Sequence, residues 1–598
     1  MRTPRPFQLK SPLSRDRWST RDLIAAALLF LASSAVVLWQ NAHLAVLWDT
    51  SYILDTSVRI SLGQLPYRDF PLAHAPLTFL VQAAIIRLGG RVFFHHVLYA
   101  AIVGGLGTVL AWRIALDTLR GRLRASWPVS LLLAAPLTVL GIYSILPFPF
   151  YDCDCVFCIL IVIFLLQRLE ADSAAAATSA KALLRPFIAG AAIPLPLFFK
   201  QNIGLPLLAT AFALVFLLLI VRQPRRGPAP HSSPAALGAI LAGALGTLLA
   251  AGLFLHFTVG VGNYLHWTIQ FASQRRLPGL QAMLAVYAEP SLLWALPAVA
   301  TALVLLRSRF ANALWARLMA LGLLAAPFVW TLASLFLSSD ADDRASSLLA
   351  LWPLLLVLSG ALTLWNLCRN PSLRALLPAI LLVTINGTLL SQQLWGSTYA
   401  IWPLLVLLIA EMIAFLAFIE PAGTAQETTP RTQLVASALA AIISATLVLC
   451  GGLYMASEER LSYARVEGPV VRSAVPALRG MAVSGPFLSD FEELLRFAAK
   501  EIPVSDGMIL IPGEDPFYFA TGRVPQFPVL LFDNATDPLS PAQLVEEARR
   551  RNIRWLIVKR ELQLKEDPTP QREDALKALQ QVFLPYRKLG SYDVYRRP

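Results

Sequence analysis

The sequence predicts a polytopic α-helical membrane protein that ends in a smaller α/β domain. Of the 598 residues, 56% are hydrophobic and only 15% are charged, whereas about 25% charged residues is typical of soluble proteins. Apolar runs of about 20 residues recur between Leu23 and Met455, and each can cross a hydrocarbon core roughly 30 Å thick. The backbone of such runs must satisfy its own hydrogen bonds, which requires helices. Beyond residue 455 the chain becomes polar.

These runs predict about thirteen spanning helices, preceded by a cytoplasmic tail over residues 1–22. The first run is longer than the apolar core of a signal peptide, which is about 7 to 15 residues, so we interpret it as a retained helix. The predicted spans are 23–42, 93–116, 127–145, 151–168, 184–199, 203–221, 235–259, 287–306, 316–337, 345–366, 375–391, 398–418 and 433–455.

One further apolar segment, 75–89, decides how the chain is oriented. It is only about 15 residues long, too short for a typical span, and we interpret it as a juxtamembrane helix within a first outer loop over 43–92. The arginine-rich turn at 120–124 then falls on the cytoplasmic side, as the positive-inside rule requires. The N-terminus is therefore expected in the cytoplasm, and the domain at 456–598 on the opposite side.

The net charge of +13 does not indicate a nucleic-acid partner. Lys and Arg accumulate in the cytoplasmic loops of membrane proteins, and membrane lipids are the expected partner of this charge. Cys153, Cys155 and Cys158 have two interpretations: thiolate ligands of a zinc ion, or small side chains that pack within a membrane helix. We favour packing, and the same holds for His95 and His96 in the second spanning helix.

The polar tail, 456–598, has the pattern of a small α/β domain. The short apolar runs GMILI (507–511), PVLLF (528–532) and IRWLIVKR (553–560) predict buried strands. Between the last two, Ser540, Pro541 and Gln543 form the signature of a capping box at a helix start. Residues 456–490 are expected to form a linker or a surface arm.

Ionisable residues near the outer ends of helices are the candidates for chemistry, because such groups are costly at membrane depth. Five loops that the predicted topology places on one side carry them. A carboxylate there can act as general base on a hydroxyl, and Lys or Arg can hold a phosphate. The candidates are Asp49 after the first helix, Asp152 and Asp154 at the start of the fourth, Lys200, Arg275 with Arg276, and Arg344.

Each candidate also has a simpler interpretation. Asp49 can cap a helix, Lys200 can snorkel to the interface, Arg275 and Arg276 can contact headgroups, and Arg344 can lie in a solvated turn. Asp152 and Asp154 are a pair of carboxylates that suits Mg²⁺ or Mn²⁺. They point about 200° apart if both are helical, so both can bind one ion only if the helix starts after Asp154. Otherwise one orients a substrate while the other caps the helix.

The first outer loop resembles that of the GT-C glycosyltransferases, most closely the bacterial relatives of protein mannosyltransferases and of the lipid A aminoarabinose transferase. The resemblance covers roughly residues 20–225 and rests on the Asp-Thr-Ser-Tyr stretch from Asp49 to Tyr52, on Arg59, Gly63 and Pro76, and on PYRDF at 66–70. It implies a bacterial inner (plasma) membrane enzyme that transfers a sugar from a polyprenyl-phosphate donor, with inversion, to a lipid, glycan or protein acceptor.

By the same resemblance, Asp49 is the general base, Asp152 or Asp154 is a second acidic position, and Lys200 faces the donor phosphate. Tyr52 and Arg59 are expected to contact substrate. Many relatives have Asp-Glu where this chain has Asp49-Thr50, which weakens the case for a metal and leaves a catalytically inactive scaffold as an alternative. A lipid or sugar transporter is a further alternative, although such proteins place ionisable residues near the membrane midplane.

Overall fold

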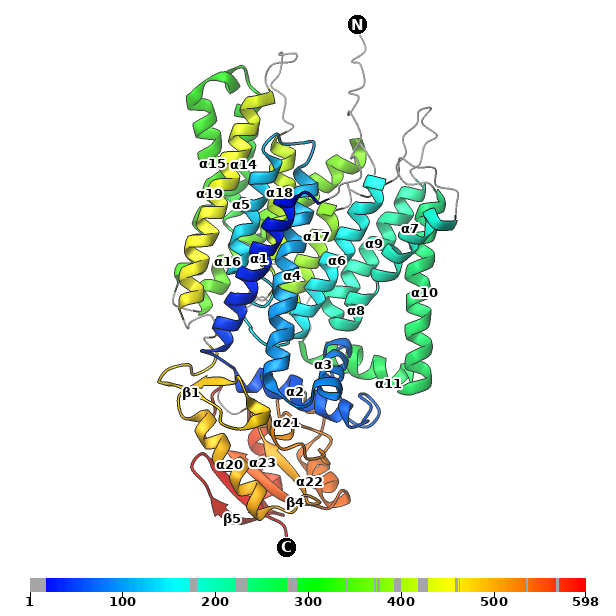
Figure 1. Cartoon of the computed structure of the whole chain (residues 1–598), viewed down its shortest axis with the longest axis vertical. Coiled ribbons are helices and arrows are strands. Elements are labelled where there is room, and N and C mark those ends of the chain that lie inside the picture. Colours follow the sequence, from blue (N-terminus) through cyan, green and yellow to red (C-terminus); the bar gives the residue numbers. More distant parts are fainter. Residues whose placement is uncertain are drawn as a thin grey trace.

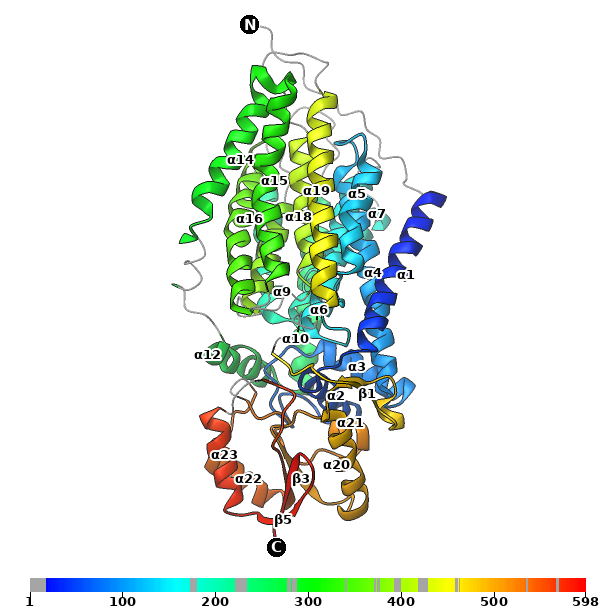
Figure 2. The same cartoon turned by 90° about the vertical axis from the view of Figure 1, so that its left-hand side faces the viewer.

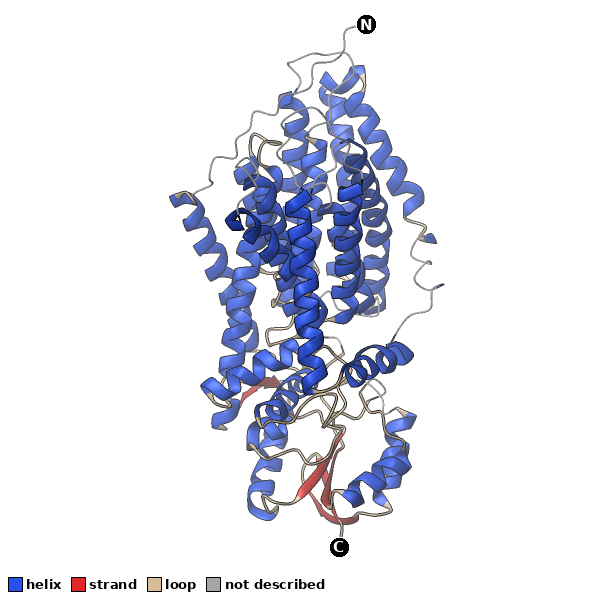
Figure 3. Cartoon of the chain, turned by 90° about the vertical axis from the view of Figure 1, so that its right-hand side faces the viewer, coloured by secondary structure: helices blue, strands red, loops and turns tan. Residues whose placement is uncertain are grey.

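The computed structural model describes most of the chain. The described residues are 18–172, 180–220, 234–276, 281, 288–338, 341–369, 373, 377–391, 400–417, 429–457, 461, 463–533, 536–565 and 569–598. A tall bundle of helices forms one end of the molecule, and a small domain with all the described strands forms the other (Figures 1 and 3).

The bundle confirms a polytopic helical protein. Seven described segments are long and apolar enough to cross a membrane, so the predicted count of thirteen is not confirmed. These are α1 (Thr20–Asn41), α4 (Phe93–Leu119), α7 with α8 (Ala180–Ala192 and Leu195–Phe199), α9 (Gln201–Ile220), α10 (Pro234–Thr258), α15 (Leu314–Leu337) and α19 (Thr429–Ala456). The remaining bundle helices are α5 (Ser126–Ala134), α6 (Tyr151–Asp172), α14 (Leu292–Arg307), α16 (Ala341–Arg369), α17 (Leu377–Ser391) and α18 (Trp402–Leu416).

The predicted span 127–145 is wrong in its second half. Helix α5 stops at Ala134, a 3-10 turn follows over Ala135–Thr138, and the chain then runs without a helix until Tyr151. Three prolines explain this, because Pro136, Pro147 and Pro149 each lack the N–H that a continuing helix needs. Residues 140–150 are nevertheless buried, so apolar composition alone does not distinguish this segment from a helix.

Segment 75–89 does not cross the bundle. It forms α3 (Leu77–Gly89), which at 1.5 Å per residue is about 20 Å long. With α2 (Leu47–Ser61) it lies at the lower end of the bundle, beside α11 (Val261–Leu265), the π-helix His266–Phe271 and α12 (Ala272–Arg276) (Figures 1 and 2). The first loop thus contains two helices of 15 and 13 residues, and their place beside the membrane stays a prediction.

The tail forms a four-stranded mixed sheet in the order β3-β4-β6-β5. Strand β3 (Gly507–Ile511) is parallel to β4 (Ile553–Lys559), which pairs antiparallel with β6 (Tyr592–Arg596), as β6 does with β5 (Leu584–Lys588). Helices α20 (Phe487–Glu501), α21 (Phe517–Thr521), α22 (Pro541–Arg550) and α23 (Pro570–Gln580) accompany it, and a hairpin of β1 (Val470–Arg472) and β2 (Ala482–Ser484) precedes it. The predicted capping box of α22 is present.

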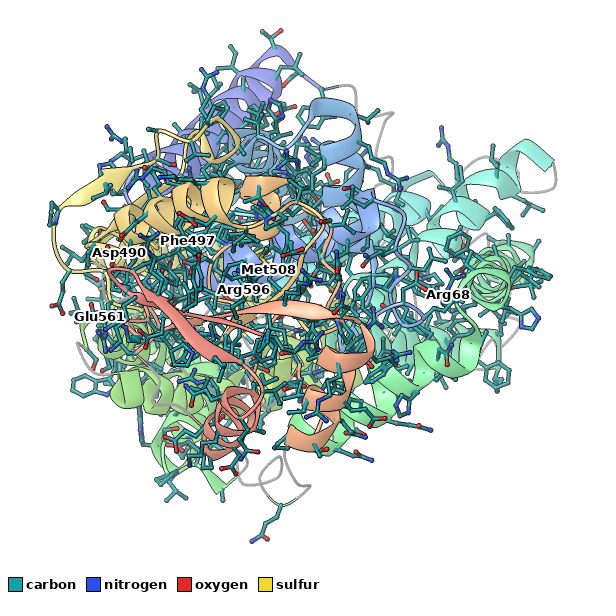
Figure 4. The ribbon with its side chains drawn as sticks, turned by 90° about the horizontal axis from the view of Figure 1, so that it is seen from below. Arg68, Asp490, Phe497, Met508, Glu561 and Arg596 are labelled. Carbon is teal, nitrogen blue, oxygen red and sulfur yellow. The ribbon has the colours of Figure 1, made fainter. Side chains whose placement is uncertain are left out.

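The strand predicted at 528–532 is absent, although its apolar side chains are largely buried. The backbone carbonyls of Pro525, Phe527 and Pro528 accept hydrogen bonds from Arg59 of α2 instead of a neighbouring strand. Proline also has no N–H to donate to a sheet. Viewed from the tail end, residues of the tail such as Phe497, Met508 and Arg596 occupy the middle of the molecule, and Arg68 of the first loop lies to one side (Figure 4).

Candidate functional site

Helix α2 joins the bundle to the tail and carries the principal candidate, Asp49, in its first turn. Val46 is the N-cap and makes no side-chain capping bond, so Asp49 is not the capping residue. The Leu47 N–H donates instead to Oε1 of Gln563 at 2.8 Å. The Asp49 carboxylate is only half-buried and accepts a hydrogen bond of 2.6 Å from the Tyr463 hydroxyl. A negative charge in this first turn is also favoured by the helix dipole.

Tyr463 is held against α2 by the tail. Its carbonyl accepts from the Lys565 N–H at 2.8 Å, and the next residue, Ala464, forms a bridge with Leu564. The Arg465 N–H also donates to the Gln563 carbonyl at 2.6 Å. The segment 463–465 is therefore a strap, fixed at one side by the tail, that brings a hydroxyl to the Asp49 carboxylate.

One turn beyond Asp49, Tyr52 begins a chain of ring contacts that ends at Lys200. The Tyr52 hydroxyl lies 2.7 Å from Nδ1 of His74. The His74 ring stacks on Tyr151, with centroids 4.3 Å apart. The same Tyr151 ring also contacts Lys200, whose ammonium lies 3.9 Å from the ring centre. At this distance a cation is attracted to the ring face.

Lys200 is buried, with 4% of its surface exposed, so it does not snorkel into water. It lies between α8 and α9 in an extended conformation, and its ammonium is 3.4 Å from Oδ2 of Asp152. The adjacent Gln201 bonds to Ala73 and Ala75 of the first loop and to the Thr268 carbonyl. The structure thus gathers the first loop, α6, the α8–α9 turn and the π-helix around one buried ion pair.

Asp154 has a different environment. Its carboxylate accepts three hydroxyl hydrogen bonds, from Thr78 at 2.7 Å, Tyr99 at 2.8 Å and Tyr143 at 2.5 Å. These groups come from α3, α4 and the segment before α6, so Asp154 ties these elements together. Asp152 and Asp154 therefore face different partners rather than one shared ion. Among the described residues there is also no group of three or more His, Cys, Asp or Glu side chains that could hold a metal.

The expected substrate contact Arg59 lies at the other end of α2 and points toward the tail. Its guanidinium donates to the carbonyls of Phe527 and Pro528, the latter at 2.6 Å, and lies 4.7 Å from the centre of the Phe70 ring. Burial lowers the pKa of Arg59 to about 10, which still leaves it charged near neutral pH. Arg59 is therefore not part of the Lys200 cluster.

Asp55, which the sequence did not single out, also docks the tail on α2. Its carboxylate accepts from the backbone N–H groups of Tyr518 at 3.2 Å and Phe519 at 2.7 Å, at the start of α21. Burial raises the pKa of Asp55 to about 8, despite these hydrogen bonds. The Ser51 hydroxyl makes a similar link, to the carbonyls of Gly513 and Asp515.

A buried charge cluster supports this docking from the tail side. The Lys559 ammonium lies 2.6 Å from Glu514 and 2.7 Å from Asp515. Burial opposes the charge of Lys559, but the two carboxylates outweigh it and raise its pKa. Glu514 also accepts from the N–H groups of Gln563 and Leu564. The sequence offered no spacing signal for this cluster, because its members are some 45 residues apart.

Three of the predicted site residues cannot be placed in the site. Arg275 and Arg276 end α12, and Arg344 lies in α16, but their side chains fall outside the described part of the structure. Their roles stay predictions. Helix α12 itself lies at the same end of the bundle as α2 and α3 (Figure 2).

The fold defines a multi-pass helical membrane protein, in which α2 carries a half-buried carboxylate beside a docked tail domain. No family model matches the chain, and no curated protein matches it either.

Among solved structures, the chain is similar to three membrane enzymes. The oligosaccharyltransferase of Archaeoglobus fulgidus has 11% identity and a TM-score of 0.48, with 96% of this chain and 74% of that one covered. ArnT from Cupriavidus metallidurans bound to undecaprenyl phosphate has 12% identity and a TM-score of 0.42, with 96% and 97% covered. The Pmt1-Pmt2 protein O-mannosyltransferase of S. cerevisiae has 18% identity and a TM-score of 0.32, with 42% and 35% covered.

All three are members of the GT-C superfamily, the group that the first outer loop resembles. With TM-scores below 0.5, these likenesses are too distant to assign an activity to the chain.

Proposed function

We propose that the chain is a GT-C-type glycosyltransferase that moves a sugar from a polyprenyl-phosphate-linked donor to an acceptor hydroxyl. The observation that carries the proposal is the arrangement on α2. Asp49 and Tyr52 lie three residues apart and therefore on one face of the helix, and Tyr52 connects through His74 and Tyr151 to the buried Lys200. Asp49, the proposed base, therefore lies beside one end of this chain of contacts, and Lys200, the proposed phosphate-binding cation, lies at the other end.

In this mechanism Asp49 takes the proton of the acceptor hydroxyl as that oxygen attacks the anomeric carbon of the donor. The new C–O bond forms as the bond from that carbon to the phosphate oxygen breaks, which inverts the configuration. Lys200 balances the charge left on the polyprenyl phosphate, and Arg275, Arg276 and Arg344 are candidates to assist it. Asp152 holds the Lys200 ammonium in place before the donor arrives.

The contact between Tyr463 and Asp49 fits this assignment. A hydroxyl that donates to Asp49 Oδ2 at 2.6 Å makes the same hydrogen bond that an acceptor hydroxyl must make before losing its proton. Tyr463 occupies only Oδ2, and an ionised carboxylate has about four acceptor sites, so an acceptor hydroxyl can bond to Asp49 while the strap 463–465 stays in place.

The proposed location is a bacterial inner (plasma) membrane. The N-terminus lies in the cytoplasm, and α2, α3 and the tail lie outside it. The start of α1 and the tail lie at opposite ends of the molecule (Figure 1), and the positive-inside rule orients them.

The test is sugar transfer by the purified full-length protein in liposomes, supplied with polyprenyl phosphates carrying radiolabelled sugars and with a membrane extract as acceptor. Asp49→Asn should lower transfer at least about 100-fold, as loss of a general base does. Asp574→Asn, a change of an exposed carboxylate on α23, is the matched control and should transfer at the wild-type rate. Wild-type transfer by Asp49→Asn would remove Asp49 as the base.

A second candidate is an inactive scaffold that binds lipid without transfer. The observation that favours it is Thr50, whose hydroxyl donates to the Val46 carbonyl at 2.7 Å and is buried, so no second carboxylate accompanies Asp49. A protein that binds undecaprenyl phosphate but transfers no sugar from any supplied donor would support the scaffold.

A further inference from the structure

Two short segments of the tail form a clamp on the N-terminal end of α2. They are the strap, 463–465, and the segment 563–565, which pair antiparallel through two backbone hydrogen bonds and one bridge. Alternate residues of a strand share one face, as do residues that lie directly opposite each other on paired strands. Tyr463 and Gln563 therefore project from the same face of the clamp, whereas the buried Ala464 occupies the other face.

Gln563 fixes the start of α2. Its side chain accepts from the Leu47 N–H at 2.8 Å and donates to the Ala45 carbonyl at 3.0 Å. The N-cap residue of α2 makes no side-chain bond of its own, so Gln563 takes the place of a helix cap. Gln563 is buried, and its own N–H donates to Glu514 at 3.1 Å. The first turn of α2, which carries Asp49, is therefore held at a defined position against the tail.

Tyr463 reaches the carboxylate in that first turn. Its hydroxyl donates to Oδ2 of Asp49 at 2.6 Å. A phenol ordinarily loses its proton at about pH 10 and an aspartate carboxyl at about pH 4, so the proton stays on Tyr463 and the carboxylate accepts. Hydrogen bonds to an ionised group are roughly twice as strong as neutral ones, and they favour the charged form. The contact therefore orients Asp49 and keeps it ionised, the state in which it can take up a proton.

Docking of the tail does not explain this contact. Ser51, Asp55 and Arg59 of α2 are buried, and each bonds to backbone groups of the tail. Tyr463 and Asp49 are only half-buried, and one more hydrogen bond there adds little to docking because water competes for both groups. The contact differs from the others in its target, which is the candidate base.

We propose that Tyr463 is a positioning residue for Asp49, so that the tail supplies part of the site of transfer. The inference rests on the proposed function, because it takes Asp49 as the base. Tyr463 makes no bond to substrate in this assignment. It uses one of the roughly four acceptor positions of the Asp49 carboxylate, and the attacking hydroxyl bonds to another.

The first test measures the ionisation of Asp49 without any transfer. A hydrophobic carbodiimide modifies carboxyl groups in their protonated form. Peptide mass spectrometry of the full-length protein in detergent then measures the modification of Asp49 from about pH 4 to about pH 8. Tyr463→Phe removes only the hydroxyl and should move the midpoint up by about one pH unit, because the ionised form loses a hydrogen bond. An unchanged midpoint would overturn the proposal.

Two controls isolate the effect of the hydroxyl. Tyr586→Phe makes the same change on the exposed strand β5, where the hydroxyl also lies close to a carboxylate, and it should keep the wild-type midpoint. Ser51→Ala removes bonds between α2 and the tail but keeps the donor to Asp49, and it should keep that midpoint too. The exposed cations of the clamp, Arg465 and Lys565, are the same in all these proteins. An equal shift in Ser51→Ala would assign the effect to docking and overturn the proposal.

The second test follows transfer against pH in the liposome assay. Tyr463→Phe should lower kcat about tenfold near neutral pH with little change in KM, because the hydrogen bond acts on the base and not on substrate binding. The acid limb of its profile should move to higher pH by the same amount as the carbodiimide midpoint. A fall in kcat at every pH, with an unmoved acid limb and a lowered melting temperature, would make Tyr463 structural and overturn the proposal.

The two tests together separate this inference from the proposed function. A shifted midpoint in a protein that transfers no sugar would retain Tyr463 as the residue that controls the ionisation of Asp49, and would remove the proposed function. Transfer with an unshifted midpoint and an unmoved acid limb would retain the function and overturn the inference.

Discussion

At the scale of single residues, variants of the buried pair Lys200 and Asp152 can show whether Lys200 has a structural or a catalytic role. Lys200→Met leaves the Asp152 carboxylate buried without its cation, which should destabilise the protein by about 3–5 kcal/mol, because breaking a buried pair exposes one charge to a low dielectric. The double variant Lys200→Met/Asp152→Asn removes both charges and should recover most of that loss. Thermal melting of both purified proteins in detergent measures the difference.

The transfer assay then decides the role of the cation. If Lys200 holds the donor phosphate, the double variant should be stable yet at least about 100-fold less active. An active double variant would make the pair structural, with no part in donor binding.

The sequence singles out a charge that stands alone between apolar runs, but it does not single out a residue whose partner is distant in the chain. Lys200 between two apolar runs, and Asp49 beyond the first, stand out in the sequence. His74, Tyr151 and Tyr463 do not, because their importance comes from contacts that only the fold creates. For the same reason the different partners of Asp152 and Asp154 could not be predicted from their spacing.

At the scale of elements, the docking of α2 on α21 should depend on pH. Burial raises the pKa of Asp55 to about 8, from the ordinary value of 3.8 that it regains when unfolded. Between these two values the folded state holds a proton that the unfolded state has lost, so stability should fall as pH rises from about 4 to about 8, and then level off. One such group contributes at most about 1.4 kcal/mol per pH unit.

The measurement is the melting temperature of the full chain from pH 5 to 9, beside that of Asp55→Asn. The asparagine retains an acceptor for the Phe519 N–H but has no proton to lose, so the fall between pH 5 and 8 should be smaller in this variant. Parallel curves for the two proteins would show that other groups cause the fall.

Element prediction succeeded where the length of an apolar run indicated one structure, as in α3 and β4, and where a capping signal marked a helix start, as in α22. It failed at 139–145 and at 528–532, where the apolar residues are largely buried without regular structure. Prolines that lack a backbone donor flank the first segment, at 136 and 147, and begin the second, at 528. In the second segment Arg59, remote in sequence, also takes the carbonyls that a strand would use.

At the scale of the whole molecule, α2 couples the bundle to the tail through side chains along its entire length. Asp49 meets the strap, Ser51 and Asp55 meet the segment around α21, and Arg59 meets the 525–528 loop. The proposed base, Asp49, therefore lies where tail and bundle meet. A shift of the tail would change the surroundings of Asp49, because the strap that contacts this carboxylate belongs to the tail.

The orientation of the whole molecule gives the last prediction. Arg68, in the first loop, and Arg124, in the turn after α4, both have exposed side chains, and the positive-inside rule places them on opposite sides of the membrane. In a cysteine-free background, Arg68→Cys should react with a membrane-impermeant maleimide in spheroplasts whose inner membrane is intact. Arg124→Cys should react only after permeabilisation. The reverse pattern would place Asp49, Lys200 and the tail in the cytoplasm, where a donor presented at the outer face could not reach them.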